Sequence, residues 1–341
     1  MAKKKKTKAK VAGKIFLVLG ILLSMTAGSA LAYVKHTGDV MISLRNYDSS
    51  GTISDLDLSQ YQLDSDTDVV NLLLVGADKN SDEQDKNVER RSDSMMIATL
   101  DVKHNKLKIT SLMRDMYVDI PGYGGNKLNA AYSFGGIKLL YKTLAQNFGI
   151  KMDGYVEVNF DAFVNVIDEI GGVEVNLTKS EADNLRTTNY IKRKKYRNVK
   201  EGKQVFNGYQ ALGYCRIRHG KKQANGRYPG VYTASGKGDD YGRTERQRLT
   251  IQAILKKVKQ LSAEELLDLA KVIMPNVKTD VSSDDVYSYL LAMFRMGTTQ
   301  LHQFSLPIEG GYSSQMISGQ SCLVPDLTAN KSALKKFIFK S

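Results

Sequence analysis

Residues 69–78 read VVNLLLVGAD, and this stretch decides the fold class. Its apolar part, Val69–Val75, continues up to Gly76 without the alternation of a half-exposed strand. Such a run is typical of a central strand that is buried on both faces of a sheet. Asp78 follows directly after this predicted strand, at a position where α/β sheets commonly carry polar site residues.

The hydrophobic pattern predicts further strands and helices on the C-terminal side of this run. Strand-like runs cover residues 94–100, 106–112, 155–158, 173–177 and 303–306, and helical spacing covers 127–148, 160–170, 244–258, 263–274, 284–296 and 331–339. The strand, helix and strand within residues 155–177 alternate as in a βαβ unit. Pro121–Asn126 is predicted to be a glycine-rich turn, and the stretch from Gly310 to the last helix is predicted to be irregular. Taken together, the pattern predicts an α/β fold.

The N-terminal region predicts a membrane anchor. Ile15–Val34 is an uncharged apolar run long enough to cross a bilayer as a helix, and lysines precede it directly. The positive-inside rule puts the lysine-rich tail in the cytoplasm and the rest of the chain outside. Ala30–Ala32 has the form of a signal-peptidase site, so a cleaved signal peptide is the alternative. The apolar run continues through that site, which favours an uncleaved anchor.

Composition excludes several classes of site. The formal net charge is +13, but seven of the lysines lie within the first 14 residues, so the charge is weak evidence for nucleic acid, and no nucleic-acid partner is expected. Two cysteines, Cys215 and Cys322, cannot form a disulfide framework. Two small buried thiols are favoured over a single disulfide. The four histidines are scattered, which does not fit a zinc site.

Arginines gather between residues 213 and 249, and three of them stand out. Arg216 and Arg218 are two residues apart, and Arg243 precedes a helical pattern. Thr244–Gln247 (TERQ) fits a capping box with Thr244 as the N-cap, which would put the positive end of the helix dipole beside these arginines. Guanidinium groups pair bidentately with oxyanions, so this set suggests a phosphate or pyrophosphate pocket. A solvated basic surface is the alternative unless other residues converge on the same chemistry.

Residues near the predicted strand ends do converge on that chemistry. Carboxylates and further cations lie at the ends of predicted strands or in the adjoining loops. Together with the arginine-rich stretch, the candidate site residues are Asp78, Asp93, Arg91, Arg114, Arg216, Arg218, Arg243, Lys127, Asp240 and Gln247. Two carboxylates that face a pyrophosphate are an ordinary arrangement for Mg²⁺, and arginines neutralise charge on a transferred phosphoryl group. For either aspartate alone, a loop cap or a salt bridge is the favoured explanation. The chain offers no Ser-His-Asp or Cys-His arrangement as a competitor.

Two other features have a favoured structural explanation and a functional alternative. The basic, tyrosine-bearing segment 187–203 is predicted to be a solvated loop, with contact to an anionic polymer or to lipid headgroups as the alternative. His219 is predicted to be a loop histidine, with acid–base work as the alternative. The remaining cations of the arginine-rich stretch are predicted to be solvated or helix-start charges: Lys221, Lys222, Arg227, Arg246 and Arg248.

Seven motifs resemble, in order, those of the LytR-CpsA-Psr family. They are VVNLLLVGAD (69–78), RSDSMM (91–96), SLMRDMYV (111–118), KLNAAY (127–132), IGGV (170–173), YCRIR (214–218) and DYGRTERQ (240–247). The resemblance covers roughly residues 68–261 and includes the preceding anchor. It implies an α-β-α sandwich with a central mixed β-sheet, preceded by one N-terminal transmembrane helix. The expected organisation is a cytoplasmic tail (1–14), an anchor (15–34), an extracytoplasmic stem (35–67) and a catalytic domain (68–341).

The resemblance also implies a function. Family members are extracytoplasmic phosphotransferases that move a glycopolymer, such as wall teichoic acid or capsular polysaccharide, from a polyprenyl-pyrophosphate carrier to a peptidoglycan sugar hydroxyl. The implied partners are therefore the lipid-linked glycopolymer, peptidoglycan and the membrane. A membrane-anchored regulator or lipid-binding protein without turnover is the alternative.

The family motifs assign a role to each candidate residue. Asp78 and Asp93 would bind Mg²⁺, and Lys127, Asp240 and Gln247 would complete the site; Arg91, Arg114, Arg216, Arg218 and Arg243 would bind the pyrophosphate and stabilise its reaction. The general base stays open, with Asp240 preferred because a reacting hydroxyl needs a nearby proton acceptor. An apolar groove for the polyprenyl chain is also implied. Its candidates, with the hydrophobic core favoured for each, are Phe134, Phe160, Phe163 and Val166.

Overall fold

The computed structural model describes residues 53, 56–77, 92–258, 260, 277–281, 285, 288, 289, 292, 296 and 300–340, apart from the side chains of Asp93 and Val258. Contacts divide the chain into two compact units, each built from separate stretches of sequence. Among the described residues, the sheet unit comprises those up to Asn159 together with those from Val277 onward, and the helical unit comprises those from Phe160 to Gln260. The predicted anchor lies outside the described residues, and every helix within them is too short or too polar to cross a membrane.

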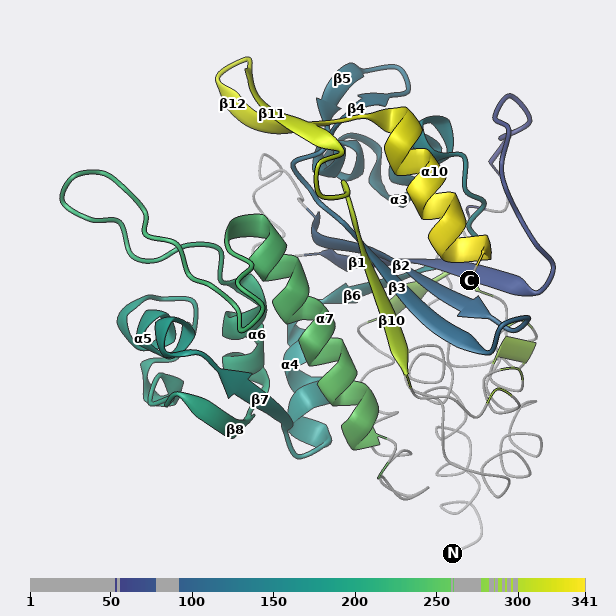
Figure 1. Ribbon diagram of the computed structural model, residues 1–341. Helices are drawn as coiled ribbons and strands as arrows, with labels where there is room; N and C mark the ends of the chain where they lie inside the picture. Colours follow the sequence, from purple (N-terminus) through teal and green to yellow (C-terminus); the bar gives the residue numbers. More distant parts are fainter. Residues whose placement is uncertain are drawn as a thin grey trace, which may run out of the picture. The chain divides into compact units, whose positions relative to one another are not determined.

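The sheet unit is built on a six-stranded mixed sheet with the strand order β10-β3-β2-β1-β6-β9 (Figure 1). The elements of the unit are β1 (Val69–Ala77), β2 (Ser92–Asp101), β3 (Lys106–Leu112), β4 (Tyr117–Ile120), β5 (Gly124–Lys127), α3 (Leu128–Phe148), β6 (Gly154–Asn159), β9 (Val277–Thr279), β10 (Leu301–Leu306), β11 (Tyr312–Ile317), β12 (Gln320–Pro325) and α10 (Leu327–Phe339).

The apolar run Val69–Val75 forms part of β1, an interior strand of this sheet. β1 pairs antiparallel with β2 and parallel with β6, and Leu73 at its centre has no exposed surface. β2 pairs antiparallel with β3, and β10 lies parallel to β3. The prediction of a buried central strand in a mixed sheet is therefore confirmed, and β3 has the predicted bounds, 106–112.

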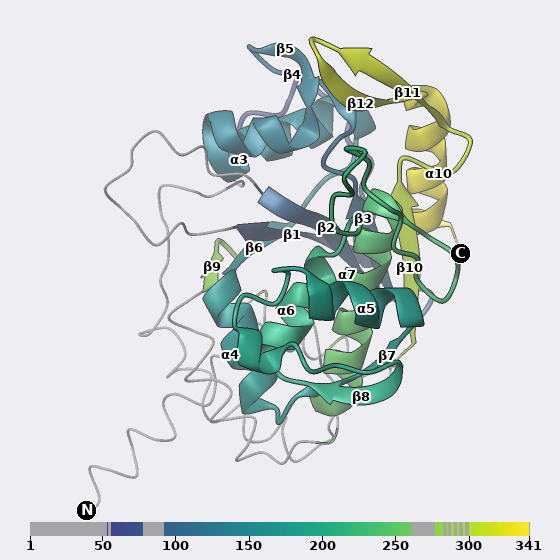
Figure 2. The ribbon, with the colours of Figure 1, turned by 90° about the vertical axis from the view of Figure 1, so that its left-hand side faces the viewer.

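Helices α3 and α10 pack on one face of the sheet and on each other (Figure 2). Their buried residues include Leu140, Leu144, Leu334 and Ile338, which fill the layer between helix and sheet. The backbone of α3 leaves the helical conformation at Gly135 and Gly136, where Gly136 has a φ of 61°. A left-handed φ is accessible to glycine without steric cost, which allows the helix to break at this pair.

Two hairpins of the sheet unit were not predicted. The expected turn at Pro121–Asn126 is in fact the tip and second strand of the β4–β5 hairpin. The stretch after Gly310, predicted to be irregular, contains the β11–β12 hairpin. One strand of each hairpin lacks the apolar alternation from which a strand is predicted: β11 has no buried residue, and β5 consists of Gly, Gly, Asn and Lys.

The helical unit contains four helices and a two-stranded sheet among the described residues. Its elements are α4 (Phe160–Glu169), β7 (Val173–Leu177), α5 (Lys179–Thr187), the 3₁₀ turn η2 (Lys194–Tyr196), β8 (Gly202–Phe206), α6 (Gly208–Arg216) and α7 (Asp239–Val258). Helix α6 packs on α4, α5 and α7, and α7 also packs on β7. The unit's core includes Leu185, Ile191, Phe206 and Ile217, each without exposed surface.

The predicted βαβ unit across residues 155–177 is wrong. β6 belongs to the six-stranded sheet, whereas β7 pairs antiparallel with β8 in a sheet of its own. The residues of β7 alternate between buried and exposed positions, as in a strand with one solvated face. An interior parallel strand would be buried on both faces, so this alternation already argued against the βαβ assignment.

Candidate functional site

Helix α7 carries three of the predicted site residues on one face. Asp240, Arg243 and Gln247 are separated by three and four positions, and residues at this spacing lie above one another along a helix. The predicted capping box is wrong, because the helix begins at Asp239 and Thr244 lies inside it. The Thr244 hydroxyl donates to the Tyr241 carbonyl, 3.0 Å away, instead of capping the helix. Asp239 and Asp240 occupy the first turn, where negative side chains interact favourably with the helix dipole.

The carboxylate of Asp240 joins two of the predicted arginines. Its Oδ2 lies 3.0 Å from Nη2 of Arg243, and its Oδ1 lies 3.1 Å from Nε of Arg218. Asp240 and Arg243 have side chains that are 8% and 5% exposed, whereas the Arg218 side chain is 34% exposed. A buried carboxylate needs such partners to offset its lost hydration. The arrangement therefore fixes both guanidinium groups and leaves that of Arg218 accessible to an anion.

Arg216 and Arg218 are positioned by helix α6, which the sequence analysis missed. Arg216 is the last residue of this helix, and its guanidinium carbon lies 5.4 Å from the centroid of the Phe160 ring. A sequence signal for this helix exists: Asn207 and Gln210 form a capping box, with the side chain of each residue accepting the other's backbone N–H. This signal predicts a helix that begins after Asn207 and leads towards Arg216.

Gln247 and Cys215 connect α7 to α6 beside these arginines. The Gln247 side-chain amide donates to the Cys215 carbonyl oxygen at 3.5 Å, and the Cys215 thiol lies 3.2 Å from the Thr250 hydroxyl. Burial raises the pKa of the Cys215 thiol to about 12, so the thiol is protonated near neutral pH. Both Cys215 and Cys322 are free and buried, which confirms the prediction of two buried thiols.

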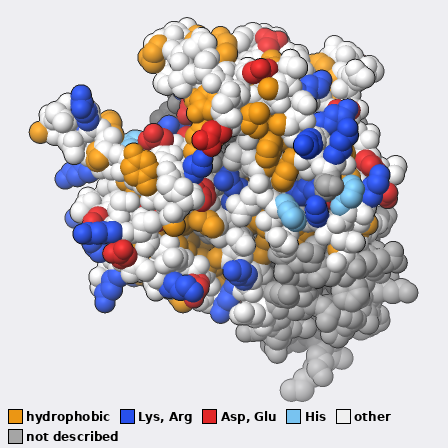
Figure 3. Space-filling model, in the orientation of Figure 1, with side chains coloured by type: hydrophobic (Ala, Val, Ile, Leu, Met, Phe, Trp, Pro, Cys, Tyr) orange, Lys and Arg blue, Asp and Glu red, His pale blue; other side chains and the backbone are white. Residues whose placement is uncertain are grey.

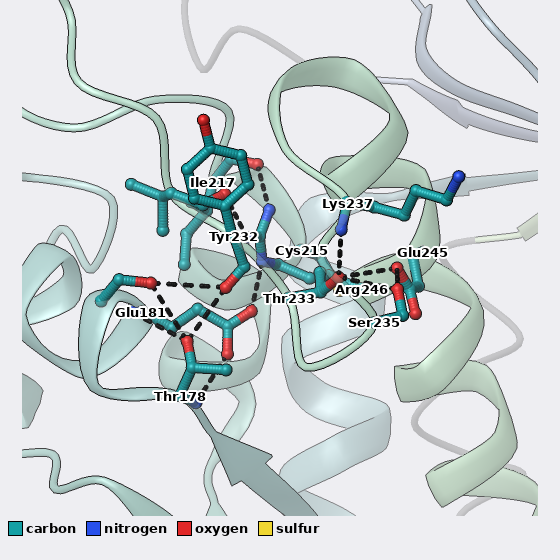
Figure 4. Close-up of polar contacts among 12 residues, drawn as sticks. Thr178, Glu181, Cys215, Ile217, Tyr232, Thr233, Ser235, Lys237, Glu245 and Arg246 are labelled. Atoms are coloured by element: carbon teal, nitrogen blue, oxygen red, sulfur yellow. Dashed lines mark hydrogen bonds and ion pairs between the residues drawn. The ribbon is translucent and has the colours of Figure 1, made fainter.

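Arg246 is not the solvated charge that the sequence analysis predicted. Its side chain is fully buried, and its Nε donates to Oε1 of Glu181 at 2.7 Å (Figure 4). Its two terminal nitrogens donate to the carbonyl oxygens of Ile217, 3.1 Å away, and Val231, 2.9 Å away. Arg246 thereby ties both ends of residues 217–231 to α7. Because Ile217 lies between Arg216 and Arg218, this network also holds the backbone of the arginine site.

The sheet unit contains a separate group of predicted residues. Arg114 follows β3, and Lys127 ends β5 immediately before α3. The carboxylate of Asp115 lies between them, with Oδ1 2.8 Å from Nζ of Lys127 and Oδ2 3.8 Å from Nε of Arg114. Asp115 was not among the predicted site residues, although it is the neighbour of Arg114 in the SLMRDMYV motif. Asp115 plays the same part in this group that Asp240 plays in the arginine site, because its carboxylate holds two cations near each other.

The predicted metal ligands can be located only in part. Asp78 and Arg91 lie outside the described residues, and Asp93 is placed by its backbone in β2. Ala77, which precedes Asp78, and Ser92, which follows Arg91, are paired with each other in the β1–β2 register. Among the side chains that the structure describes, no group of three metal-binding residues is present. The assignment of Mg²⁺ to Asp78 and Asp93 stays a prediction.

The remaining candidates have ordinary structural surroundings. Nδ1 of His219 lies 3.1 Å from the Gly220 carbonyl oxygen, and its ring packs against Tyr228 at a centroid distance of 4.3 Å. Among the proposed groove residues, Val166 is buried in the core, Phe160 and Phe163 are partly exposed, and Phe134 is 40% exposed. Phe134 stacks on Tyr123 at a centroid distance of 4.8 Å. Of the groove candidates, Val166 alone is a core residue.

Comparisons with known proteins identify relatives over most of the chain. The regulatory protein MsrR of Staphylococcus aureus (strain Mu50 / ATCC 700699) is 31% identical over 79% of this chain and 74% of its own length. The polyisoprenyl-teichoic acid–peptidoglycan teichoic acid transferase TagU of Enterococcus faecalis (strain ATCC 700802 / V583) is 33% identical over 80% of this chain and 81% of its own.

A solved structure has the same fold. It is the LytR-CPS2A-psr family protein YwtF (TagT) with bound octaprenyl pyrophosphate lipid, with a TM-score of 0.56 and 23% identity over 81% of this chain and 93% of that one. The family model described as the LytR_cpsA_psr family matches residues 39–337. With the ordered motifs and the mixed sheet, these matches show that the chain belongs to the LytR-CpsA-Psr family.

Proposed function

We propose that this protein is an extracytoplasmic phosphotransferase that attaches an anionic glycopolymer to peptidoglycan. Its donor would be the glycopolymer linked to a polyprenyl-pyrophosphate carrier, and its acceptor a sugar hydroxyl of peptidoglycan. Wall teichoic acid and capsular polysaccharide are the two polymer classes that the family resemblance suggests. The bond that is made is a phosphodiester with either polymer.

One observation carries the proposal: the buried Asp240 carboxylate holds the guanidinium groups of Arg218 and Arg243 close together. Phosphoryl transfer needs cations that are fixed in place before charge develops on the phosphoryl oxygens. The side chain of Arg243 is nearly buried, and that of Arg218 is partly exposed. Arg218 is therefore suited to contact the substrate, while Arg243 supplies charge behind it.

The reaction balances without an oxidant or reductant. The acceptor hydroxyl oxygen bonds to the phosphorus atom that carries the glycan, and the bond from that phosphorus to the bridging oxygen of the pyrophosphate breaks. Polyprenyl monophosphate is the leaving group. The hydroxyl proton passes to a base, for which Asp240 is the candidate from the sequence. Since Asp240 also holds two arginines, its positioning role and its role as a base are separate predictions.

The other predicted residues fit this scheme as contributors of charge. Arg216, Arg91, Arg114 and Lys127 would bind pyrophosphate oxygens, and Gln247 would complete the site. A magnesium ion held by Asp78 and Asp93 would neutralise phosphate charge. The anchor predicted at residues 15–34 would keep the enzyme at the membrane that contains its lipid-linked donor.

The printed names of the relatives support the proposal. TagU is named as a teichoic acid transferase with a polyisoprenyl-linked donor and a peptidoglycan acceptor, and it is 33% identical to this chain. The name supports a polyisoprenyl-linked donor, and the arginine pair suits the phosphate groups of such a donor.

The test is a transfer assay with the full-length protein in detergent, a polyprenyl-pyrophosphate-linked glycan and peptidoglycan fragments. Arg218→Ala should abolish formation of the phosphodiester-linked product. Arg227→Ala is the matched control, because Arg227 lies in the same arginine-rich stretch but is exposed, and it should retain activity. Full activity in Arg218→Ala would refute the site assignment.

A regulatory function is the second candidate, and the name of MsrR favours it. In that case the protein would bind the polyprenyl pyrophosphate and leave it unchanged. Prolonged incubation of the wild-type protein with donor, acceptor and Mg²⁺ distinguishes a transferase from a regulator. Quantitative recovery of the donor, with binding that depends on Arg218, would favour the regulator.

A further inference from the structure

A second basic surface of the helical unit is not used by the proposed reaction. It lies on the segment between α5 and β8, and Figure 3 shows Lys and Arg side chains over this part of the unit. We call it the basic platform; its members are Lys192, Arg193, Lys194, Lys195, Arg197 and Lys200. Lys192–Lys195 are four consecutive exposed cations.

The platform is fixed in place at both ends. Ile191 before it and Val199 within it are completely buried. Nε of Arg197 donates to the Ile191 carbonyl oxygen at 2.7 Å, and Nη1 of Arg186 donates to the Val199 carbonyl oxygen at 2.9 Å. The exposed cations therefore project from an ordered loop rather than from a solvated chain, and less conformational entropy is lost when a ligand binds.

Two tyrosines organise the cations of the platform. Arg193 lies over the Tyr209 ring at 4.2 Å, and Lys195 lies over the Tyr196 ring at 4.8 Å. The two rings stack on each other at 5.7 Å, and the Tyr196 carbonyl oxygen accepts a hydrogen bond from Gln210 at 3.0 Å. Cation–π contacts of this kind hold a side chain without neutralising its charge.

Three lysines of the platform are not engaged in ion pairs among the described residues. Within the described parts of the chain, no ion pair joins Lys192, Lys194 or Lys195 to a carboxylate. Like charges at such short spacing repel one another, and a bound polyanion relieves that repulsion while releasing its own counterions. A ligand with repeated negative charges fits this surface better than a single anion does.

The platform is joined directly to the arginine site within the same unit. The Tyr190 hydroxyl accepts the backbone N–H of Arg218 at 3.3 Å and donates to the His219 carbonyl oxygen at 3.3 Å. Helix α6, which ends at Arg216, approaches the start of the platform at Gly213. A Cβ atom at Gly213 would lie 2.7 Å from Cγ1 of Ile191, so the close approach requires glycine.

We propose that the basic platform binds the polyphosphodiester chain of the glycopolymer donor, beyond the pyrophosphate held by the arginine site. This rests on the proposed function, and it identifies the donor as a polymer with a phosphate in each repeat. A membrane surface fits less well. Peripheral membrane segments combine basic residues with exposed apolar ones. Residues 187–204 expose no large apolar side chain, and the exposed Val205 that follows them is a single residue of β8 rather than an apolar face.

The test is equilibrium binding of poly(glycerol phosphate) chains to the full-length protein in neutral detergent. Lys192→Gln/Lys194→Gln/Lys195→Gln removes three exposed platform charges, and Lys103→Gln/Lys336→Gln/Lys340→Gln removes three exposed charges of the sheet unit. The platform variant should bind the polymer about tenfold or more weakly, with a smaller dependence on salt, because fewer phosphates are neutralised. The control variant should bind like the wild type. Equal affinity of the two variants would overturn the proposal.

Two further arms identify the ligand and separate this proposal from the proposed function. Vesicles containing anionic phospholipid replace the polymer in one arm; loss of vesicle binding with unchanged polymer binding would overturn the proposal in favour of a membrane surface. Arg218→Ala is used in the other arm. It should still bind the polymer through the platform, because binding needs no turnover. Platform-dependent binding by a wild-type protein without transferase activity would refute the proposed reaction and leave the polymer site standing.

Discussion

Nε of Arg246 lies 2.7 Å from Oε1 of Glu181, and the two side chains are 0% and 1% exposed. The residues are on different helices, α7 and α5, and Glu181 also accepts the backbone N–H of Thr178 at 2.9 Å. Arg246 further donates to the backbone on both sides of residues 218–230. This buried pair is therefore a junction between two helices and the segment that carries Arg218.

Replacing Glu181 with Gln should destabilise the protein strongly. The change removes the charge that compensates the buried Arg246 guanidinium, and breaking a buried pair in this way costs about 3–5 kcal/mol. Thermal melting followed by circular dichroism measures the effect. Glu174→Gln is the control, because that carboxylate is 67% exposed, and it should leave the melting temperature unchanged. Equal melting temperatures for the two variants would mean that the Glu181–Arg246 pair does not stabilise the helical unit.

Asp240→Asn should lower both turnover and substrate binding. The amide cannot pair ionically with the guanidinium groups of Arg218 and Arg243, so both lose their fixed positions; a loss of transfer of about 100-fold is expected. Asp239→Asn, an exposed neighbour, is the control and should retain activity. The measurement is kcat together with donor Kd. A fall in kcat with unchanged Kd and an altered pH profile would instead support Asp240 as the general base.

Gly213→Ala should weaken the junction between α6 and the basic platform. The new Cβ would meet Cγ1 of Ile191 at 2.7 Å and the Ile191 backbone nitrogen at 3.1 Å, so the loop has to move. We expect a lower melting temperature and weaker binding of poly(glycerol phosphate), with a larger effect for Gly213→Ser. Wild-type melting and binding in both variants would show that the contact tolerates a side chain.

Cys215 should resist alkylation in the folded protein. Burial raises its pKa from 9.0 to about 12, and the thiolate is the reactive form, so little of it exists at pH 8. Above pH 9 the unfolded chain loses this proton while the folded chain keeps it, so the thiol lowers stability as the pH rises towards 12. Mass spectrometry after iodoacetamide treatment should find Cys215 unmodified in the native protein and modified in denaturant. Modification of the native protein at pH 8 would contradict the described burial.

The strand core of the fold could be predicted from the sequence because it depends on local apolar runs. β1 is a nearly continuous apolar run, β3 carries Leu107, Ile109 and Leu112 between polar residues, and each strand lies where its pattern indicated. The β11–β12 hairpin could not be predicted this way, since β11 is polar and is held by backbone hydrogen bonds to its partner. Strand β7 was found but assigned to the wrong sheet, because local pattern does not specify a strand's partner.

The residues of the site could be predicted from the sequence, but the contacts that each of them makes could not. Arg218, Asp240 and Arg243 were expected to act together, and the structure joins them in two ion pairs. Arg246 belongs to the same motif and has the same chemistry, yet it is a buried structural residue. Only its burial and its partner Glu181, 65 positions away in sequence, distinguish it. No pattern in the sequence around Arg246 carries that information.

The central claim is that the protein transfers a glycan-bearing phosphoryl group from a lipid pyrophosphate, and the lipid product tests it most directly. Full-length protein is incubated with a polyprenyl-pyrophosphate-linked glycan and peptidoglycan fragments, and the lipid released is identified by mass spectrometry. The account predicts polyprenyl monophosphate in equal amount to a peptidoglycan product linked through a phosphodiester, and neither product with Arg218→Ala. Release of polyprenyl pyrophosphate, or recovery of the donor intact, would contradict it.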